Sequence, residues 1–176
     1  MGYDFVNFQG SPFQYFTYGA SVSEVRLDVL SGETHVCKVD ILQDVGRSIN
    51  PALDIAQIEG GFVQGMGWLT TEELVWKSQG AQRGRLMTQA PQTYKIPTAR
   101  DVPEVFNVAL FDNVNAQDGV DINVNGSKAV GEPPFMLANS VFLAIRDAVS
   151  ACLPANELIK LNAPATPEAV LKALQP

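Results

Sequence analysis

The octet Ser127-Lys-Ala-Val-Gly-Glu-Pro-Pro134 places one carboxylate, Glu132, between a glycine and two prolines. Gly131 permits a backbone path that a larger side chain would obstruct. The prolines fix their own φ angles, and Pro133 is expected to keep Glu132 out of the α region. We therefore expect a stiff connector that leads into a helix. Glu132 then either points at a reacting atom or is solvated at the start of that helix.

The segment after the octet has the pattern of an amphipathic helix. Between Phe135 and Ala151, four apolar residues recur at intervals of four: Leu137, Val141, Ile145 and Val149. This spacing places them on one helical face. We expect that apolar stripe to bury itself and thereby hold the octet in place.

A second octet, Gly60-Gly-Phe-Val-Gln-Gly-Met-Gly67, has four glycines inside a segment that otherwise reads as a helix. Asn50-Pro51 is a strong start for that helix, with Asn50 as N-cap. Because glycine within a helix costs roughly 1 kcal/mol relative to alanine, another backbone or a flat ligand is expected to approach closely. The Gln64 amide, a donor and an acceptor, either reads the edge of a heterocycle or faces water. The expected buried residues are Leu53, Ile58, Phe62, Met66 and Leu69.

Alternating apolar residues predict the strands. Val22 to Val29 and His35 to Ile41 form a β-hairpin around a turn at Ser31 to Glu33. Thr71 to Trp76 reads as a short strand, and Val105 to Phe111 as another. With the helices, these strands predict an α+β fold in which helices pack on one face of a mixed sheet.

Polar stretches separate these elements. Gln79 to Gln92 reads as a loop or surface hairpin, and Asn113 to Asn125 as an exposed loop. Asp44 and Arg47 read as a surface turn held by a local ion pair. Lys128 either forms a structural ion pair with a loop, favours ionisation of the nearby carboxylate, or holds a cofactor oxygen.

Composition narrows the function classes. The chain has 176 residues, of which 46% are hydrophobic, and a net charge of −7. It can form one domain or a large piece of a bigger one. Its charge argues against a nucleic-acid partner, because phosphate backbones would be repelled. No run of about 20 apolar residues and no signal peptide are visible, so we expect no membrane partner and a cytoplasmic location.

The cysteines and the single histidine offer little metal chemistry. Cys37 and Cys152 lie far apart and form no C-x-x-C motif. An iron–sulfur cluster normally needs four thiolates, so this chain alone cannot hold one. His35 lies within a strand pattern, where a structural role is expected.

Five motifs in order resemble the molybdenum-binding part of xanthine dehydrogenases, in the xanthine oxidase family of molybdenum hydroxylases. The motifs are Asp44-Val-Gly46, Asn50-Pro51, Gln57 to Gly65, Thr93 to Pro97, and Ser127 to Pro134. The resemblance implies a larger molybdopterin-binding domain, of which residues 1–152 form a C-terminal segment. Residues 153–176 read as a linker and a short helix from Thr166. Such enzymes are several times longer than this chain.

The resemblance also implies the roles of individual residues. Glu132 would be the general base toward a molybdenum-bound hydroxide, in the oxidation of hypoxanthine or xanthine at an electron-poor ring carbon. The cofactor-binding residues would be Gln64 and Gly65 beside the pterin, and Ala129, Val130 and Gly131 along the wall of the metal pocket. No residue of this chain is expected to ligate the metal. The molybdenum–pterin cofactor would be shared with sequence outside this chain.

The partners implied are the remainder of the molybdenum subunit, iron–sulfur and flavin (FAD) domains or subunits, and a small purine substrate. We expect the isolated chain to be inactive. Two alternatives stay open: the same segment of an aldehyde oxidase-type molybdenum hydroxylase, and a non-catalytic assembly or docking domain.

Overall fold

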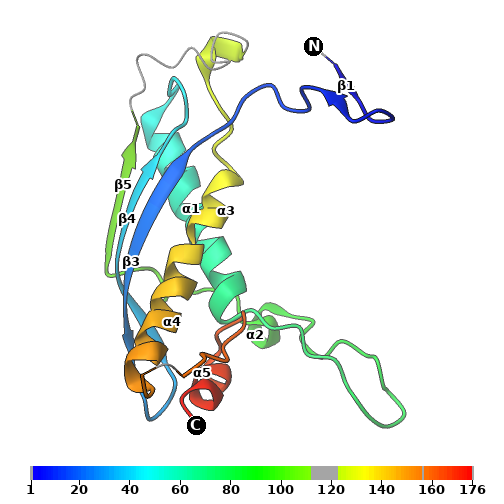
Figure 1. The fold of residues 1–176 in the computed structure, drawn as a ribbon, viewed down its shortest axis with the longest axis vertical. Helices are drawn as coiled ribbons and strands as arrows, with labels where there is room; N and C mark the ends of the chain where they lie inside the picture. The colour runs from blue at the N-terminus through cyan, green and yellow to red at the C-terminus, as the bar shows by residue number, and fades with distance from the viewer. Residues whose placement is uncertain (1, 112–122, 156, 176) are drawn as a thin grey trace.

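The fold is built on a three-stranded sheet with helices on one face (Figure 1). The computed structural model describes residues 2–111, 123–155 and 157–175. The strands are β3 (Gly19–Leu27), β4 (Thr34–Gln43) and β5 (Val105–Leu110), in the order β3-β4-β5. β3 and β4 pair antiparallel, and β4 and β5 pair parallel. The predicted α+β fold with a mixed sheet is therefore confirmed.

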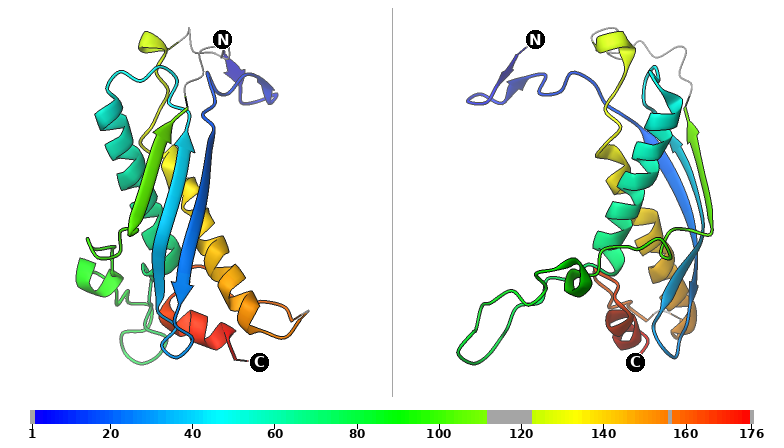
Figure 2. Two further views of the ribbon diagram at one scale, coloured as in Figure 1. Left: turned by 90° about the vertical axis from the view of Figure 1, so that its left-hand side faces the viewer. Right: turned by 180° about the vertical axis from the view of Figure 1, so that it is seen from behind.

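Three helices cover the sheet. They are α1 (Pro51–Thr70), α3 (Pro133–Leu137) and α4 (Asn139–Cys152). Figure 2 shows all three on the same face, with α1 and α3 side by side. The core between sheet and helices is apolar, since Val39, Phe62 and Ile145 are fully buried.

The predicted hairpin forms because its turn is well satisfied. The Asp28 carboxylate accepts a hydrogen bond from the Leu30 backbone N–H at 2.8 Å. Gly32 has a φ of +75°, which glycine adopts readily. On β4, Val36, Val39 and Ile41 are buried beneath the helices. The hairpin thus supplies both a stable sheet edge and part of the core.

Helix α1 begins as predicted, since the Asn50 side chain accepts from the Leu53 backbone N–H at 3.4 Å. Ile58, Phe62 and Met66 are buried, but Leu53 is 63% exposed, so its predicted burial is wrong. Leu53 lies in the first turn, beyond the cover of the sheet and the other helices. Of the stripe predicted after the octet, α4 buries Val141, Ile145 and Val149 as expected. The single helix predicted from Phe135 to Ala151 is wrong, because it divides at Ala138 into α3 and α4, and Leu137 lies in α3 and is only partly buried.

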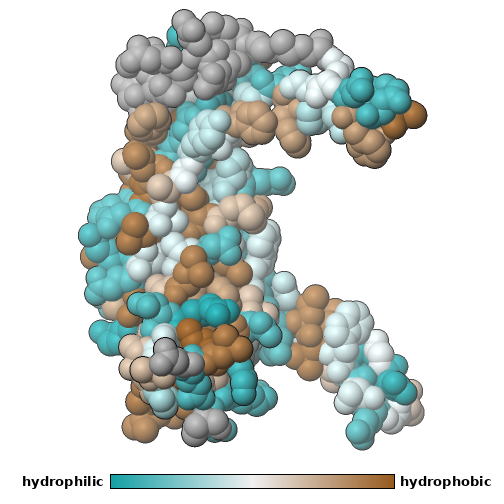
Figure 3. Space-filling view, viewed as in Figure 1, coloured by the Kyte–Doolittle hydropathy of each residue, from teal (hydrophilic) through white to brown (hydrophobic). Residues whose placement is uncertain are grey.

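Two arms leave the core on the side away from the sheet (Figures 1 and 2). The N-terminal arm carries β1 (Tyr3–Asp4) and β2 (Gln9–Gly10). The second arm, residues 72–90, includes an isolated bridge between Trp76 and Leu86. Of the loop or surface hairpin predicted at Gln79 to Gln92, the hairpin forms, but its pairing begins at Val75 and Pro91 already belongs to a helix. The helix-bearing face is hollowed between the arms (Figure 3).

The strand predicted at Thr71 to Trp76 is wrong. Thr71 is the C-cap of α1, and its backbone N–H donates to the Gly67 carbonyl. The segment is paired only at its end, where the Met87 backbone N–H donates to the Val75 carbonyl at 2.8 Å and Trp76 bridges Leu86. α2 (Pro91–Tyr94) and the 3₁₀ turn η2 (Val124–Gly126) complete the described connections. Most of the predicted loop at Asn113 to Asn125 lies outside the described residues.

The C-terminal residues share the main core. Helix α5 (Pro167–Ala173) starts at Thr166, whose hydroxyl accepts from the Ala169 backbone N–H at 3.2 Å. The Ala165 backbone N–H donates to the Leu69 carbonyl at 2.7 Å. Val170 is fully buried. The predicted short helix and its cap are therefore confirmed.

By length and composition alone, the stretch Pro133–Cys152 is apolar enough to cross a membrane. The expectation that no such run exists is wrong by this measure. The stretch is two helices, and its Val141, Ile145 and Val149 lie in the core. Packing against the sheet accounts for that apolar face, and the absence of a membrane partner stays a prediction.

Candidate functional site

Glu132 lies at the start of α3 with an exposed side chain. Its φ of −95° and ψ of −31° are in the α region, so the expectation that Pro133 would exclude that region is wrong. Helix α3 begins at Pro133 itself, and the Glu132 carbonyl accepts from the Phe135 backbone N–H at 3.0 Å. This first turn favours helical geometry despite the proline. The carboxylate has no hydrogen bond within the described parts of the chain.

Glycines of α1 let the backbone leading to Glu132 approach closely. A Cβ added to Gly61 would lie 2.9 Å from the Gly131 carbonyl oxygen. A Cβ added to Gly65 would lie 2.5 Å from the Phe135 carbonyl oxygen. Either distance is shorter than a carbon atom tolerates. The predicted approach of another backbone to this glycine-rich stretch is therefore confirmed, and that backbone belongs to the octet and α3.

Two amide side chains line α1 beside this contact. Gln57 and Gln64 are seven residues apart, so at about 3.6 residues per turn they point in nearly the same direction, roughly 10 Å apart. Both are exposed. The Gln57 side-chain oxygen would lie 3.8 Å from a Cβ on Gly131. Gln57 is thus a neighbour of the octet that the sequence analysis missed, although it belongs to one of the quoted motifs.

The other end of the octet is anchored by a buried ion pair. Lys128 Nζ lies 2.5 Å from Asp44 Oδ2, and the two side chains are 1% and 3% exposed. The structural ion pair predicted for Lys128 is confirmed, and its ammonium is directed at Asp44. The surface turn predicted for Asp44 with Arg47 is wrong, because Asp44 is buried. An oppositely charged side chain 84 positions away outcompetes the local partner.

The three predicted wall residues form the short backbone between these fixed points. Ala129 and Gly131 are exposed, and Val130 is partly buried. The Ala129 backbone N–H donates to the Tyr15 hydroxyl at 3.1 Å. The sequence analysis missed Tyr15, whose only signal was an aromatic-rich stretch. Gln64, Gly65, the wall and Glu132 therefore belong to one neighbourhood, built from α1, the octet and α3.

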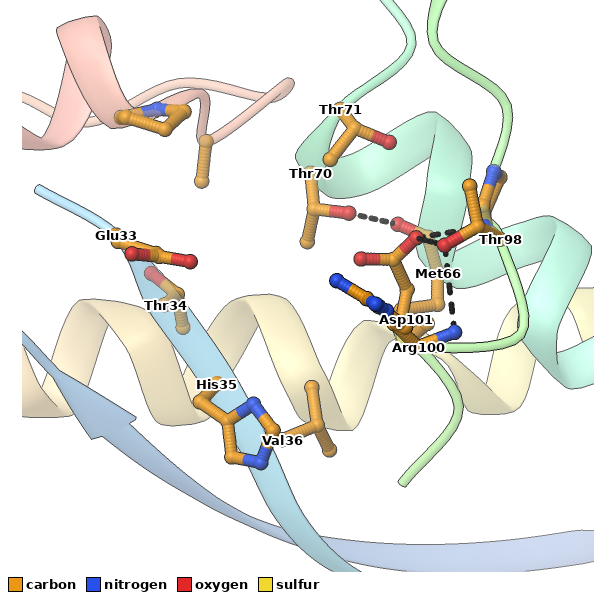
Figure 4. Close-up of a pocket in the computed structure, with 13 residues that line it drawn as sticks. Glu33, Thr34, His35, Val36, Met66, Thr70, Thr71, Thr98, Arg100 and Asp101 are labelled. Atoms are coloured by element: carbon orange, nitrogen blue, oxygen red, sulfur yellow. Dashed lines mark hydrogen bonds between the residues drawn. The ribbon is translucent and has the colours of Figure 1, made fainter. Parts of the chain in front are cut away.

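A separate pocket of about 590 Å³ lies at the far end of α1 (Figure 4). It is bounded by the start of β4, the last turn of α1 and the loop before β5. His35, Met66 and Thr98 are among its lining residues. Neither Glu132 nor Gln64 lines it. Among the described residues, the candidate site is an exposed face.

His35 has a structural partner, since its Nε2 lies 2.7 Å from Glu104 Oε1. The predicted structural role of His35 therefore agrees with its contacts. Within the described residues, no group of three or more His, Cys, Asp or Glu side chains is placed to hold a metal ion.

The Thr93 to Pro97 element packs where α1 ends. Glu72 is largely buried, and burial raises the pKa of its carboxyl, while the nearby Tyr94 hydroxyl opposes that shift. The same carboxylate raises the pKa of Tyr94. Lys95 ends α2 with a φ of +60°. The interpretation of Tyr94 as an aromatic packed against a loop agrees with this geometry.

The available groups fit a flat, polar cofactor at the edge of the chain. They comprise an exposed carboxylate, two exposed amides on one helix face, and exposed backbone at Ala129 and Gly131. The space beside Gly131 is open, since among the described residues only the Gln57 oxygen comes within 4 Å of an added Cβ. Hydrogen-bonding groups over an open strip of backbone suit the edge of a heterocycle.

Comparison with known proteins identifies the family. The sequence model of the molybdopterin cofactor-binding domain matches residues 1–103, more than half of the chain. The chain belongs to the molybdopterin cofactor-binding domain family. This match includes Gln64 and Gly65 and ends before the octet, so it does not itself assign Glu132.

Longer relatives extend the similarity of this molybdopterin cofactor-binding domain. Xanthine dehydrogenase of Oryza sativa subsp. japonica is 46% identical over 98% of the chain, which spans 13% of that protein. Quinoline 2-oxidoreductase of Pseudomonas putida 86 superposes with a TM-score of 0.70 and 27% identity, covering 86% of this chain and 18% of that one. Aldehyde oxidoreductase of Desulfovibrio desulfuricans gives 0.66 and 25%, covering 94% and 16%.

Proposed function

We propose that this molybdopterin cofactor-binding domain supplies one wall of the active site of a xanthine dehydrogenase-like molybdenum hydroxylase. The observation that carries the proposal is the seam between α1 and the octet. There, Gly61 and Gly65 bring Glu132 and its connector against the helix that bears Gln64. The similarity to a xanthine dehydrogenase over 98% of the chain supports a purine, hypoxanthine or xanthine, as substrate.

Glu132 acts as the general base in this proposal. A base must lie within hydrogen-bond reach of the proton that it removes. Glu132 is exposed and has no hydrogen bond to the described residues, so its carboxylate oxygens are available to accept a proton. The α1–α3 contact on one side and the Lys128 anchor on the other limit the movement of its backbone. A fixed backbone shortens the search for productive geometry.

The other predicted site residues bind and orient the cofactor. Gln64 donates to and accepts from the pterin edge, beside the side-chain-free surface of Gly65. The backbone of Ala129, Val130 and Gly131 lines the reaction space. The molybdenum–pterin cofactor, when bound, supplies the oxygen atom transferred to the substrate and accepts the electrons. Iron–sulfur and flavin groups in partner domains or subunits would receive those electrons.

A second candidate is the same role in an aldehyde-oxidising enzyme. The match to an aldehyde oxidoreductase with a TM-score of 0.66 favours it, because that fold covers 94% of the chain. The higher identity to a xanthine dehydrogenase, 46%, makes the purine substrate our first choice. Turnover of xanthine and of an aromatic aldehyde by the assembled enzyme separates the two.

Replacing Glu132 by glutamine in the assembled enzyme tests the role of the base. The amide keeps the size of the side chain and cannot accept the proton, so turnover should fall by roughly 10²- to 10⁴-fold. Molybdenum and pterin content should stay near that of the unchanged enzyme. The matched control is Glu168→Gln, an exposed carboxylate on α5. Full turnover by Glu132→Gln at normal metal content would remove Glu132 from the mechanism.

The isolated chain provides a further check. It offers Gln57, Gln64 and exposed backbone along one open face, and the residues that the structure describes form no opposite wall. We therefore expect no xanthine-dependent dye reduction from the chain alone. Dye reduction by the purified chain with bound molybdenum would show that it encloses the cofactor by itself.

A further inference from the structure

The buried pair Asp44–Lys128 lies directly beneath the proposed cofactor wall. Lys128 immediately precedes Ala129, and only three residues separate it from Glu132. The Lys128 Nζ to Asp44 Oδ2 distance is 2.5 Å, and both side chains are almost fully buried. Removing two charges from water costs several kcal/mol per ion, and only close, well-bonded geometry offsets that cost. A pair in this position therefore constrains its surroundings strongly.

Each member of the pair is held from more than one direction. The second oxygen of Asp44 accepts from the Gly46 backbone N–H at 2.8 Å. The Lys128 ammonium lies 5.7 Å from the centre of the Tyr18 ring, within the range of a cation–π contact. The Lys128 backbone N–H donates to the Val45 carbonyl at 2.9 Å. The 44–46 turn and Lys128 thus form one locked unit.

The turn at residues 44–46, opposite Lys128, is also tightly packed. Gly46 has a φ of +64°, and a Cβ there would lie 2.5 Å from the Gly126 carbonyl oxygen. The Arg47 backbone N–H donates to that same carbonyl at 2.9 Å. Gly46 and Ser127 form an isolated antiparallel bridge. This bridge consists of that hydrogen bond and the one from the Lys128 backbone N–H to the Val45 carbonyl, so two backbone hydrogen bonds and the close packing at Gly46 fix the chain just before the wall.

We propose that Asp44 and Lys128 are positioning residues, which set the backbone of Ala129 to Gly131 and through it the placement of Glu132. The α1–α3 contact fixes the far end of this connector, and the ion pair fixes the near end. The inference rests on the proposed function for its catalytic consequence. Its structural part concerns this chain alone.

Hydrogen exchange on the cofactor-free chain tests the structural part. In Asp44→Asn and in Lys128→Met, a buried charge loses its partner, a change that typically destabilises by roughly 3–5 kcal/mol. The amides of Lys128 and Ala129 should then exchange at least about 100-fold faster, at about 1.4 kcal/mol per factor of ten. Amides of β4, such as Ile41, exchange through global unfolding, so any acceleration there measures the global loss of stability, and the excess at residues 128 and 129 is local. Unchanged exchange at residues 128 and 129 in a folded variant would overturn the proposal.

The double variant Asp44→Asn/Lys128→Met separates positioning from mere stability. Removing both charges leaves no unpaired buried ion, so most of the lost stability should return. In the assembled enzyme, we expect near-normal molybdenum content but a kcat reduced about tenfold or more, because small displacements of reacting groups can cost roughly 10²-fold. If the single variants do not fold, exchange is measured in the double variant instead. Faster exchange at residues 128 and 129 supports the proposal, and unchanged exchange there overturns it.

Each outcome has a distinct meaning. Recovery of both stability and kcat in the double variant would show that each charge serves only to compensate the other. That result would overturn the positioning role. Lys172→Met, which breaks the exposed pair with Glu168, should leave exchange at the wall and kcat unchanged. Full activity of Glu132→Gln would instead refute the proposed function, and it would not alter the exchange results on the cofactor-free chain.

Discussion

Two glycines of α1, five residues apart, should respond to alanine with opposite changes in stability. Gly60 is exposed, and an added Cβ would meet no atom of the described residues within 4 Å, apart from its own helix backbone and chain neighbours. Alanine there should raise the free energy of unfolding by roughly 1 kcal/mol, the helix-propensity difference. Gly65 faces α3, where an added Cβ would lie 2.5 Å from the Phe135 carbonyl oxygen and 3.1 Å from Ala138 Cβ. These are backbone or short, buried atoms that cannot swing aside.

The size of the effect follows from subtracting the two variants. Both gain the same propensity term, so the difference between Gly60→Ala and Gly65→Ala isolates the clash at the α1–α3 seam. Overpacking of this kind costs roughly 1–3 kcal/mol. For a chain of this size, each kcal/mol moves the melting temperature by roughly 2–4 °C. Gly65→Ala should therefore melt roughly 2–12 °C below Gly60→Ala.

Urea unfolding and thermal melts of the purified chain measure this difference. Trp68 is a suitable fluorescent reporter, because its ring packs edge-on against Phe135 with centroids 4.9 Å apart. A shifted native emission in Gly65→Ala, absent in Gly60→Ala, would locate the strain at the seam. Equal stabilisation by both substitutions would refute the close approach of α3, and with it the geometric basis of the proposed site.

Two further predictions concern single residues away from the seam. Burial raises the pKa of Glu72, so the folded chain binds this proton more tightly than the unfolded chain does. Its contribution to stability should be complete below the ordinary value of 4.5 and be lost as the pH rises through the raised pKa. Glu72→Gln should flatten that part of the pH–stability curve, and an unchanged curve would contradict the assignment. Asn50→Ala, which removes the N-cap of α1, should cost about 1 kcal/mol, while Asn50→Ser should restore most of it. Loss of less than a few tenths of a kcal/mol in urea unfolding would show that the cap contributes little.

Local patterns predicted most of the fold. The alternation in β3 and β4, the cap at Asn50 and the stripe on α4 each follow from a few adjacent residues. The false strand at Thr71 to Trp76 shows the limit of such reasoning. Apolar and β-branched residues favour a strand only where a neighbouring strand offers hydrogen bonds, and partners of that kind are not visible in sequence.

The candidate site was harder to predict, because its supports join distant parts of the chain. The glycines of α1 indicated that another backbone approaches this helix closely. Their spacing could not show that this backbone belongs to the octet and α3. Asp44 was assigned to Arg47, its neighbour in sequence, whereas burial selects Lys128. A local ion pair on the surface contributes little, while a buried one must be satisfied wherever its partner lies. Sequence distance therefore misleads most where burial is greatest.

The residues of the site fall into two sets with different needs. Asp44, Lys128 and Gly65 are buried and satisfied within this chain. Glu132 and Gln64 are exposed, without side-chain partners among the described residues. The positions of the site residues are thus set by contacts within this chain. The exposed side chains of Glu132 and Gln64 acquire partners only when the cofactor and the opposing wall are present. It follows that substitutions of the buried set should disturb the isolated chain. Glu132→Gln, a surface change there, should alter its stability by less than about 0.5 kcal/mol and act only in the assembled enzyme.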